Sequence, residues 1–236
     1  MTLSELAAVM TAGFATIAGS VMAAYIGFGV DAGHLLAASV MSAPASLIIA
    51  KIMYPETETP GTLAGATVHT DEQTVNFIDA AASGAIQGLK IAAIVGAMLI
   101  AFISLIAMIN YLLAFAHTSL GALFGYAFSP IAWCMGVDSG DTLTVGRLLG
   151  TKIAVNELVA YLDLVRLKAQ MSPRSVVIAT YALCGFANFG SVAVAIGGIG
   201  AMAPTRRADL ARIGIKTMFG GALASFVTAS IAGMMV

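Results

Sequence analysis

The feature that most constrains the fold of this chain is a series of long stretches that carry no charged side chain. The hydrocarbon core of a bilayer is about 30 Å thick, so a helix that rises about 1.5 Å per residue crosses it in about 20 residues. Residues 6–30, 91–116 and 176–202 are uncharged and reach this length. Because backbone groups inside lipid must bond within the protein, these stretches predict an all-α integral membrane protein.

Composition agrees with a membrane protein and argues against two other classes. The chain is 59% hydrophobic and 10% charged, whereas soluble domains average about 45–50% apolar and about 25% charged residues. The formal net charge of -1 supplies no basic surface, so nucleic acid is not expected as a partner. The sequence contains no glycine-rich phosphate loop, no cluster of cysteine and histidine, and no nucleophile placed beside a base. We therefore do not expect an enzyme.

The apolar stretches differ in quality, and the polar segments between them divide the chain into parts. Residues 91–116 form the plainest span, with Ser104 and Asn110 as its most polar residues, whereas other stretches contain several glycines, a proline or polar residues near their middle. In chain order, we expect a broken helix at 6–30, a short helix at 35–51 that Pro44 interrupts, a loop and an interfacial helix at 54–90, a span at 91–116, an interfacial segment and a re-entrant hairpin at 118–168, a broken helix at 176–202 and a final span at 207–236.

The hairpin is predicted from charges inside an apolar segment. LTVGRLLGTKIAVNELVAYLDLVRLK, residues 143–168, contains six charged side chains, and each would cost about 2.5–3.5 kcal/mol at the centre of a bilayer. Two half-helices that meet at a tip avoid much of this cost and point Asn156 and Glu157 into the protein. An intramembrane carboxylate indicates a functional site. The alternative is that Glu157 pairs with Lys152 or Arg147 and only stabilises the fold.

A weak internal repeat links the two broken helices. AGFATIAGSV at residues 12–21 resembles CGFANFGSV at 184–192. Paired, glycine-interrupted apolar segments are typical of inverted-repeat transporters that bind solute near the bilayer midplane. Asn188 and Ser191 suit a polar, hydroxyl-bearing solute, and Thr16 with neighbouring carbonyls offers the hard oxygens that sodium takes.

Several motifs resemble one known family. They are MTAGFATIAGSVMAAYIGFGVDAGHLL at 10–36, SVMSAPASLIIAKIMYPETE at 39–58, GTKIAVNELVAYL at 150–162 and ALCGFANFGSVAVAIGGIGAMAPTRRADLARIG at 182–214. Together they are similar to the C-terminal part of the concentrative nucleoside transporters, over essentially the whole chain. In that family the scaffold helices and a first hairpin with a Gly-Gln-Thr-Glu motif precede the matching region, and this sequence does not contain them.

The resemblance implies roles for particular residues. The glutamate at the hairpin tip of the family binds ribose hydroxyls, which matches Glu157, with Asn156 beside it. Substrate contacts in the second broken helix match Phe186, Asn188 and Ser191. In the first broken helix of the family, the sodium ligands match Thr16 and Ile17. A residue of the same helix that lies near the base matches Val21.

The resemblance also implies a mechanism and partners. The chain is expected to be part of a symporter that couples nucleoside uptake to Na+ or H+, with no organic cofactor, as a homotrimer among the lipids of the cytoplasmic membrane. Transport would use an elevator-like movement, and residues 91–116 would belong to the scaffold. The basic run at 205–216 should be cytoplasmic. The alternatives are a non-transporting fragment that assembles with a longer homologue and a pore-like membrane protein.

Overall fold

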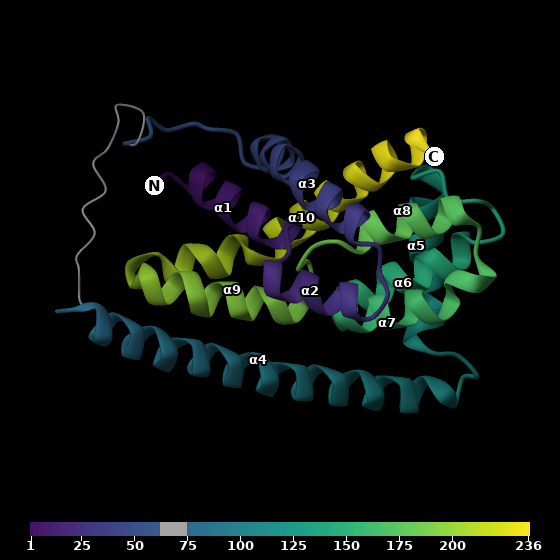
Figure 1. The fold of residues 1–236 in the computed structure, drawn as a ribbon, viewed down its shortest axis with the longest axis horizontal. Coiled ribbons are helices and arrows are strands. Elements are labelled where there is room, and N and C mark those ends of the chain that lie inside the picture. Colours follow the sequence, from purple (N-terminus) through teal and green to yellow (C-terminus); the bar gives the residue numbers. More distant parts are fainter. Residues whose placement is uncertain (62–74) are drawn as a thin grey trace.

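The computed structural model describes residues 1–61 and 75–236, which are drawn in colour in Figure 1. These residues contain helices and no strand, as the sequence predicts. The α-helices are α1 (Leu3–Ala15), α2 (Gly19–Gly27), α3 (Ala32–Met53), α4 (Phe77–Ala114), α5 (Leu120–Cys134), α6 (Thr142–Ala154), α7 (Glu157–Leu167), α8 (Pro173–Leu183), α9 (Phe189–Met202) and α10 (Arg207–Met235).

Three helical segments within the described residues are long and apolar enough to cross a membrane. They are Leu3–Gly27, which comprises α1 and α2, then Ala32–Met53, and finally Pro204–Met235, which contains α10. Their lengths of 25, 22 and 32 residues exceed the roughly 20 residues that a bilayer requires. The length and composition of these segments are those of an integral membrane protein.

Helix α10 occupies the centre of the packing. It contacts α1, α3, α8 and α9, whereas α4 runs along one side of the molecule and touches only α9 and α5 extensively among the described elements. Small residues bring α10 close to its neighbours: a Cβ added at Gly221 would lie 2.5 Å from the Cβ of Phe14 in α1. Small residues at such contacts are how helices approach one another inside membranes.

Two helices are broken near their middles, as the repeat predicts, and the two breaks touch. Residues 16–18 separate α1 from α2, and residues 184–188 separate α8 from α9. Gly185 has a φ of +136°, and a Cβ there would lie 2.8 Å from the carbonyl oxygen of Phe14. Only glycine combines this backbone angle with so close an approach. The second break therefore lies directly against the end of α1.

Helices α6 and α7 form the helical hairpin, with its tip at Val155 and Asn156. Helix α5 packs along α6, where a Cβ at Gly146 would meet the carbonyl oxygen of Gly125 at 2.5 Å. Although glycines and Pro130 lie in this region, α5 is continuous from Leu120 to Cys134. The glycines serve close packing of α5 on α6 and do not break the helix.

The prediction that Pro44 interrupts the second apolar stretch is wrong. Helix α3 continues through Pro44 for 22 residues, from Ala32 to Met53. The hydroxyls of Ser42 and Ser46 donate to backbone carbonyls of the same helix, at 2.7 and 2.8 Å. Serine side chains and neighbouring helices commonly satisfy the backbone around a proline in a membrane helix. The expected short helix at 35–51 is thus a full span.

The interfacial helix expected before residue 91 and the span expected at 91–116 form one helix. Helix α4 runs for 38 residues from Phe77 to Ala114, because glycine in a helix interior costs only about 1 kcal/mol and no proline separates the two parts. The loop expected from residue 54 is described as far as residue 61, and residues 62–74 lie outside the described part of the chain.

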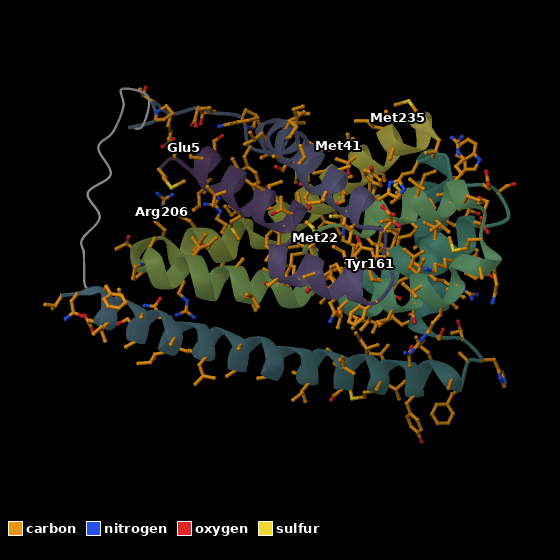
Figure 2. The ribbon with its side chains drawn as sticks, viewed as in Figure 1. Glu5, Met22, Met41, Tyr161, Arg206 and Met235 are labelled. Atoms are coloured by element: carbon orange, nitrogen blue, oxygen red, sulfur yellow. The ribbon has the colours of Figure 1, made fainter. Side chains whose placement is uncertain are left out.

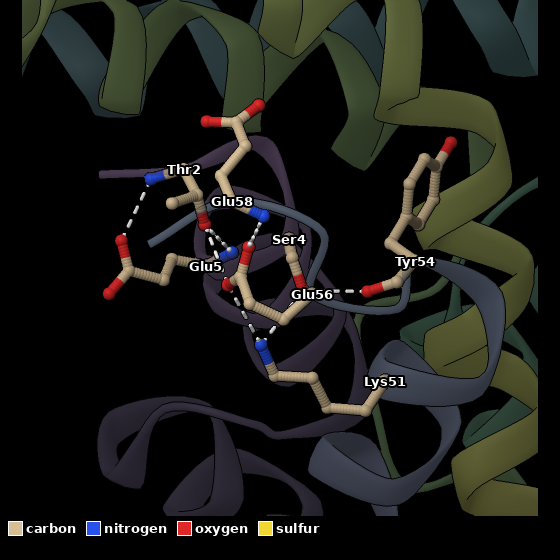
Figure 3. A network of polar contacts seen from close by, with 7 residues as sticks. All are labelled: Thr2, Ser4, Glu5, Lys51, Tyr54, Glu56 and Glu58. Carbon is tan, nitrogen blue, oxygen red and sulfur yellow. Dashed lines mark hydrogen bonds and ion pairs between the residues drawn. The ribbon is translucent and has the colours of Figure 1, made fainter. Parts of the chain in front are cut away.

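One end of the molecule is held together by the polar contacts in Figure 3. The Thr2 hydroxyl donates to the Glu56 carboxylate at 2.8 Å, and the Lys51 ammonium donates to the Ser4 hydroxyl at 2.8 Å. The Ser4 hydroxyl in turn donates to the Tyr54 carbonyl at 2.6 Å. These bonds join the start of α1 to the end of α3, so α1 and α3 are attached at the end away from the helix breaks.

Candidate functional site

The candidate site lies where three interruptions of helical structure meet. These are the break at 16–18, the break at 184–188 and the hairpin tip at 155–156. Helix ends carry backbone groups without partners inside the helix, so their approach gathers polar groups in an otherwise apolar interior. Non-helical backbone at membrane depth is found where it is buried in protein or lines a cavity. The site therefore has the form of a transporter site.

Glu157 is the central polar side chain of this site. It is only 2% exposed, and it is the first residue of α7, where a negative charge is stabilised by the helix dipole. The Tyr25 hydroxyl donates to one carboxylate oxygen at 2.9 Å, and the Asn188 amide donates to the other at 3.1 Å. The helix that follows the first break, the hairpin and the second break are thus linked through a single carboxylate.

The alternative that Glu157 serves as half of a stabilising ion pair does not match this geometry. Among the described residues, no ion pair joins Glu157 to Lys152 or to Arg147. The Lys152 ammonium is fully buried and donates to the carbonyl of Ala182 at 2.8 Å. Lys152 therefore stabilises the carbonyl end of α8, where a positive charge is favourable.

Asn156 and Asn188 have the same local role at two different helix starts. The side-chain oxygen of Asn156 accepts from the Val159 amide at 2.9 Å and caps α7. The side-chain oxygen of Asn188 accepts from the Ser191 amide at 2.8 Å and caps α9. Asparagine is among the preferred residues at this position. Because the side-chain oxygen of Asn188 makes the cap, its side-chain NH2 group is left to donate to Glu157.

A cavity of about 480 Å³ lies beside these groups. Its lining contains five of the predicted residues, namely Thr16, Ile17, Val21, Phe186 and Ser191. The other three, Asn156, Glu157 and Asn188, are not among its lining residues. Asn188 connects the two sets through its bond to the Ser191 amide. The tertiary structure therefore brings the predicted residues into one region, with five around the cavity and the others joined to it through Asn188.

The residues predicted to hold a cation lie in the first break. Thr16 ends α1 with an extended backbone, and its hydroxyl donates to the Ala12 carbonyl at 2.9 Å. Ile17 follows in the same extended segment, so its carbonyl lies outside the helices. No group of three or more histidine, cysteine, aspartate or glutamate side chains suited to a metal occurs among the described residues. Hydroxyl and carbonyl oxygens are the ligand type available to an alkali cation here.

Several residues that sequence reasoning missed hold the backbone around the second break and support the site from outside. The Tyr161 hydroxyl donates to the Thr180 carbonyl at 2.8 Å, and the Ser225 hydroxyl donates to the Cys184 carbonyl at 2.6 Å. Both bonds satisfy carbonyls at or near the end of α8, as Lys152 does. Figure 2 shows Tyr161 in the crowded region near α2 and α7. A tyrosine inside an uncharged span is a signal that could have identified Tyr25, because a buried hydroxyl needs a partner.

The fold and the site are those of polytopic α-helical membrane transporters with discontinuous helices. The family described as Na+ dependent nucleoside transporter C-terminus matches residues 34–233. The chain belongs to this family.

Similar proteins cover the whole chain. An uncharacterized transporter of Haemophilus influenzae is 45% identical over 100% of this chain and 60% of its own length. The human solute carrier family 28 member 3 is 43% identical over 100% of this chain and 37% of its own length. The nucleoside permease NupC of Helicobacter pylori is 40% identical over 99% of this chain and 58% of its own length. The chain thus spans about three fifths of the bacterial relatives that it matches.

Solved structures give the same result for the fold. The transporter CNTnw in an inward-facing substrate-bound state has a TM-score of 0.88 and 46% sequence identity, over 99% of this chain and 58% of that one. CNTnw in an intermediate state has a TM-score of 0.87 and 45% identity, over 100% of this chain and 60% of that one. The all-α transporter fold is confirmed, and the expectation that the chain is no enzyme agrees with these relatives.

Proposed function

We propose that this chain forms the substrate-binding C-terminal part of a symporter that couples nucleoside uptake to a cation gradient. Relatives named as nucleoside transporters support the substrate class, and the family description supports sodium as the coupling ion. The observation that carries the proposal is the buried carboxylate of Glu157, held by Asn188 beside a cavity where three helix interruptions meet.

In this proposal the sugar binds between the hairpin and the second break. A carboxylate oxygen has two acceptor positions, so each oxygen of Glu157 accepts a ribose hydroxyl in addition to its present bond. Asn156 and Ser191 supply further polar groups beside it. Phe186 and Val21 line the apolar side of the cavity and form the surface for the base. Such a division of polar and apolar groups suits a neutral, amphipathic solute.

The cation site is proposed at Thr16 and Ile17. The coupling ion is Na+ or, as the alternative, H+, and coupling requires only that each ligand favours the state to which the other binds. We further propose that α6 and α7 enter the cytoplasmic membrane as a re-entrant hairpin and that the assembled protein is a homotrimer. The basic run at 205–216 is proposed to face the cytoplasm.

The test is uridine uptake into proteoliposomes. The chain is reconstituted alone and after co-expression with the part of CNTnw that precedes the matching region, with complete CNTnw as the positive control. We expect saturable uptake that requires a sodium or proton gradient in at least one of the two samples. Glu157→Gln should abolish it, whereas the matched control Glu56→Gln, in the peripheral network of Figure 3, should leave it unchanged.

Other outcomes would favour the two alternatives. Flux that does not saturate with uridine would indicate a pore. Assembly with the CNTnw part without any uptake or uridine binding, while complete CNTnw transports, would indicate a non-transporting fragment and would contradict the symporter proposal.

A further inference from the structure

We propose that Tyr25 is a positioning residue that couples the first helix break to the carboxylate of Glu157. The inference rests on the proposed function and adds a physical connection between its cation and sugar sites. The two sites lie on different elements, since Thr16 and Ile17 lie in the first break, whereas Glu157 begins α7. Coupling between them requires a contact that changes when either site is occupied.

The bond between Tyr25 and Glu157 is suited to this role. The Tyr25 hydroxyl donates to Oε1 at 2.9 Å, and the Asn188 amide donates to Oε2 at 3.1 Å. Each carboxylate oxygen is therefore held by a different broken helix. A displacement of α2 changes the direction of one bond while the other stays in place, so it rotates the carboxylate that would face the sugar.

Helix α2 has a single fully buried side chain, while Val21 and Met22 are partly buried and pack against the core. Of its nine residues, all of which the structure describes, only Tyr25 is buried, and it is fully so. The carbonyl of Tyr25 also accepts the amides of Phe28 and Val30, both at 3.1 Å, so the end of α2 is fixed around it. Movement at residues 16–18, which directly precede α2, therefore reaches the carboxylate of Glu157 through the hydrogen bond of Tyr25.

The proposed role of Tyr25 depends on its hydroxyl group and not on its ring alone. A buried hydroxyl without a partner is costly, so Tyr25 is stable in its place only while Glu157 accepts its hydrogen bond. The neighbouring Tyr161 shows the contrasting case. Its ring centroid lies 4.6 Å from that of Tyr25 and it is equally buried, but its hydroxyl donates to the backbone carbonyl of Thr180. Tyr161 therefore holds the fold, whereas Tyr25 holds a side chain of the site.

The proposed sequence of events follows from these contacts. A cation bound at Thr16 and Ile17 would fix the carbonyls of the break, and with them the direction of α2. Tyr25 then holds Oε1 of Glu157 in one orientation, with the remaining acceptor positions of the carboxylate directed to the sugar. By linkage, a nucleoside bound to Glu157 stabilises the same position of α2 and so raises cation affinity by the same factor.

The matched variants Tyr25→Phe and Tyr161→Phe test the proposal, because each removes one buried hydroxyl of the same pair. Uridine affinity is measured with and without sodium on the reconstituted assembly. In the unmodified protein and in Tyr161→Phe, sodium should raise the affinity by the same factor, of about 5- to 150-fold for typical coupling. In Tyr25→Phe this factor should fall towards one. An unchanged factor in Tyr25→Phe, or an equal loss in both variants, would overturn the proposal.

A second measurement on the chain itself does not depend on nucleoside binding. Hydrogen exchange followed by mass spectrometry reports the amides of 16–19 and of 155–160. We expect sodium to slow exchange in both segments in the unmodified chain and in Tyr161→Phe, but only in 16–19 in Tyr25→Phe. Sodium protection of 155–160 that persists in Tyr25→Phe, or is absent in the unmodified chain, would overturn the inference. The expected exchange pattern without any uridine binding would support it while contradicting the proposed function.

Discussion

The two broken helices begin from similar sequences and end in different surroundings. In the second, between α8 and α9, Asn188 is 3% exposed and caps the following helix. In the first, between α1 and α2, the corresponding cap position is Ala18, which is exposed and makes no side-chain cap bond. The carbonyls around the second break accept bonds from buried side chains of other elements.

The difference indicates how one architecture can supply two kinds of site. A break whose polar groups are held by neighbouring helices is rigid and can present a fixed set of donors and acceptors. A break that lacks a cap and precedes a helix with one buried residue costs less to move. We therefore regard the second break as the fixed half of the site and the first as the adjustable half. Each variant below would test that division.

The largest effect is expected at the paired glycines of the repeat, of which Gly185 lies within the second break and Gly13 lies just before the first. Gly185→Ala forces a Cβ into the left-handed backbone region and to within 2.8 Å of the Phe14 carbonyl, for which we expect a loss of stability of about 2–5 kcal/mol. Its counterpart in the repeat, Gly13→Ala, meets no atom within 4 Å and should be neutral or stabilising by up to about 1 kcal/mol. Thermal unfolding of the protein in detergent compares them. Equal losses would remove the distinction between the breaks.

The next effect is on binding. Glu157→Gln removes the charge that accepts from Tyr25 and Asn188, and hydrogen bonds to charged groups contribute about 1.5–3 kcal/mol. Uridine affinity should therefore fall by about 10- to 100-fold, as measured by isothermal titration calorimetry on the reconstituted assembly. Glu56→Gln, at the far end of α1 and α3, is the matched control and should bind as before. Unchanged affinity in Glu157→Gln would exclude Glu157 from the site.

A smaller loss is expected at the helix that supports the second break. Ser225→Ala leaves the Cys184 carbonyl without its 2.6 Å bond, which should cost about 1–2 kcal/mol of stability because the carbonyl is buried. Ser230→Ala is the control, since its hydroxyl bonds only to the Phe226 carbonyl one turn earlier in α10. If the two variants have the same melting temperature, the second break is not stabilised by the side chain of Ser225 in α10.

The smallest effect should be a gain. Ala18→Ser offers α2 the side-chain cap that it lacks, and a serine cap contributes about 0.5–1 kcal/mol relative to alanine. We expect slightly higher thermal stability together with slower hydrogen exchange at 19–22. Asn188→Ala at the second break should produce the opposite change, of similar or larger size. Faster exchange in Ala18→Ser would contradict our description of the first break.

The sequence predicted the broken helices and the hairpin because their signals are local. Glycine and asparagine within an uncharged run mark a break, and charges around Glu157 mark a helix that cannot cross lipid. The helix boundaries that were predicted wrongly depend on packing between elements that lie far apart in the sequence. Pro44 was expected to interrupt a helix that continues through it, and the interfacial helix before residue 91 was expected to stand apart from the span that it begins. In both cases the effect of a proline or glycine inside the helix depends on what packs beside it.

The eight predicted site residues came from motifs, and their roles remain predictions. What the sequence by itself determined is the solvent in which the chain folds, its helical class, and the places where helices stop, because apolar length, glycine and capping residues act within a few positions of the chain. Only the tertiary structure decided which groups satisfy each polar atom. Tyr25 faces Glu157 across 132 positions of sequence, and Lys152 bonds the end of α8 instead of that carboxylate. Such pairings follow from packing in three dimensions, which no local pattern encodes.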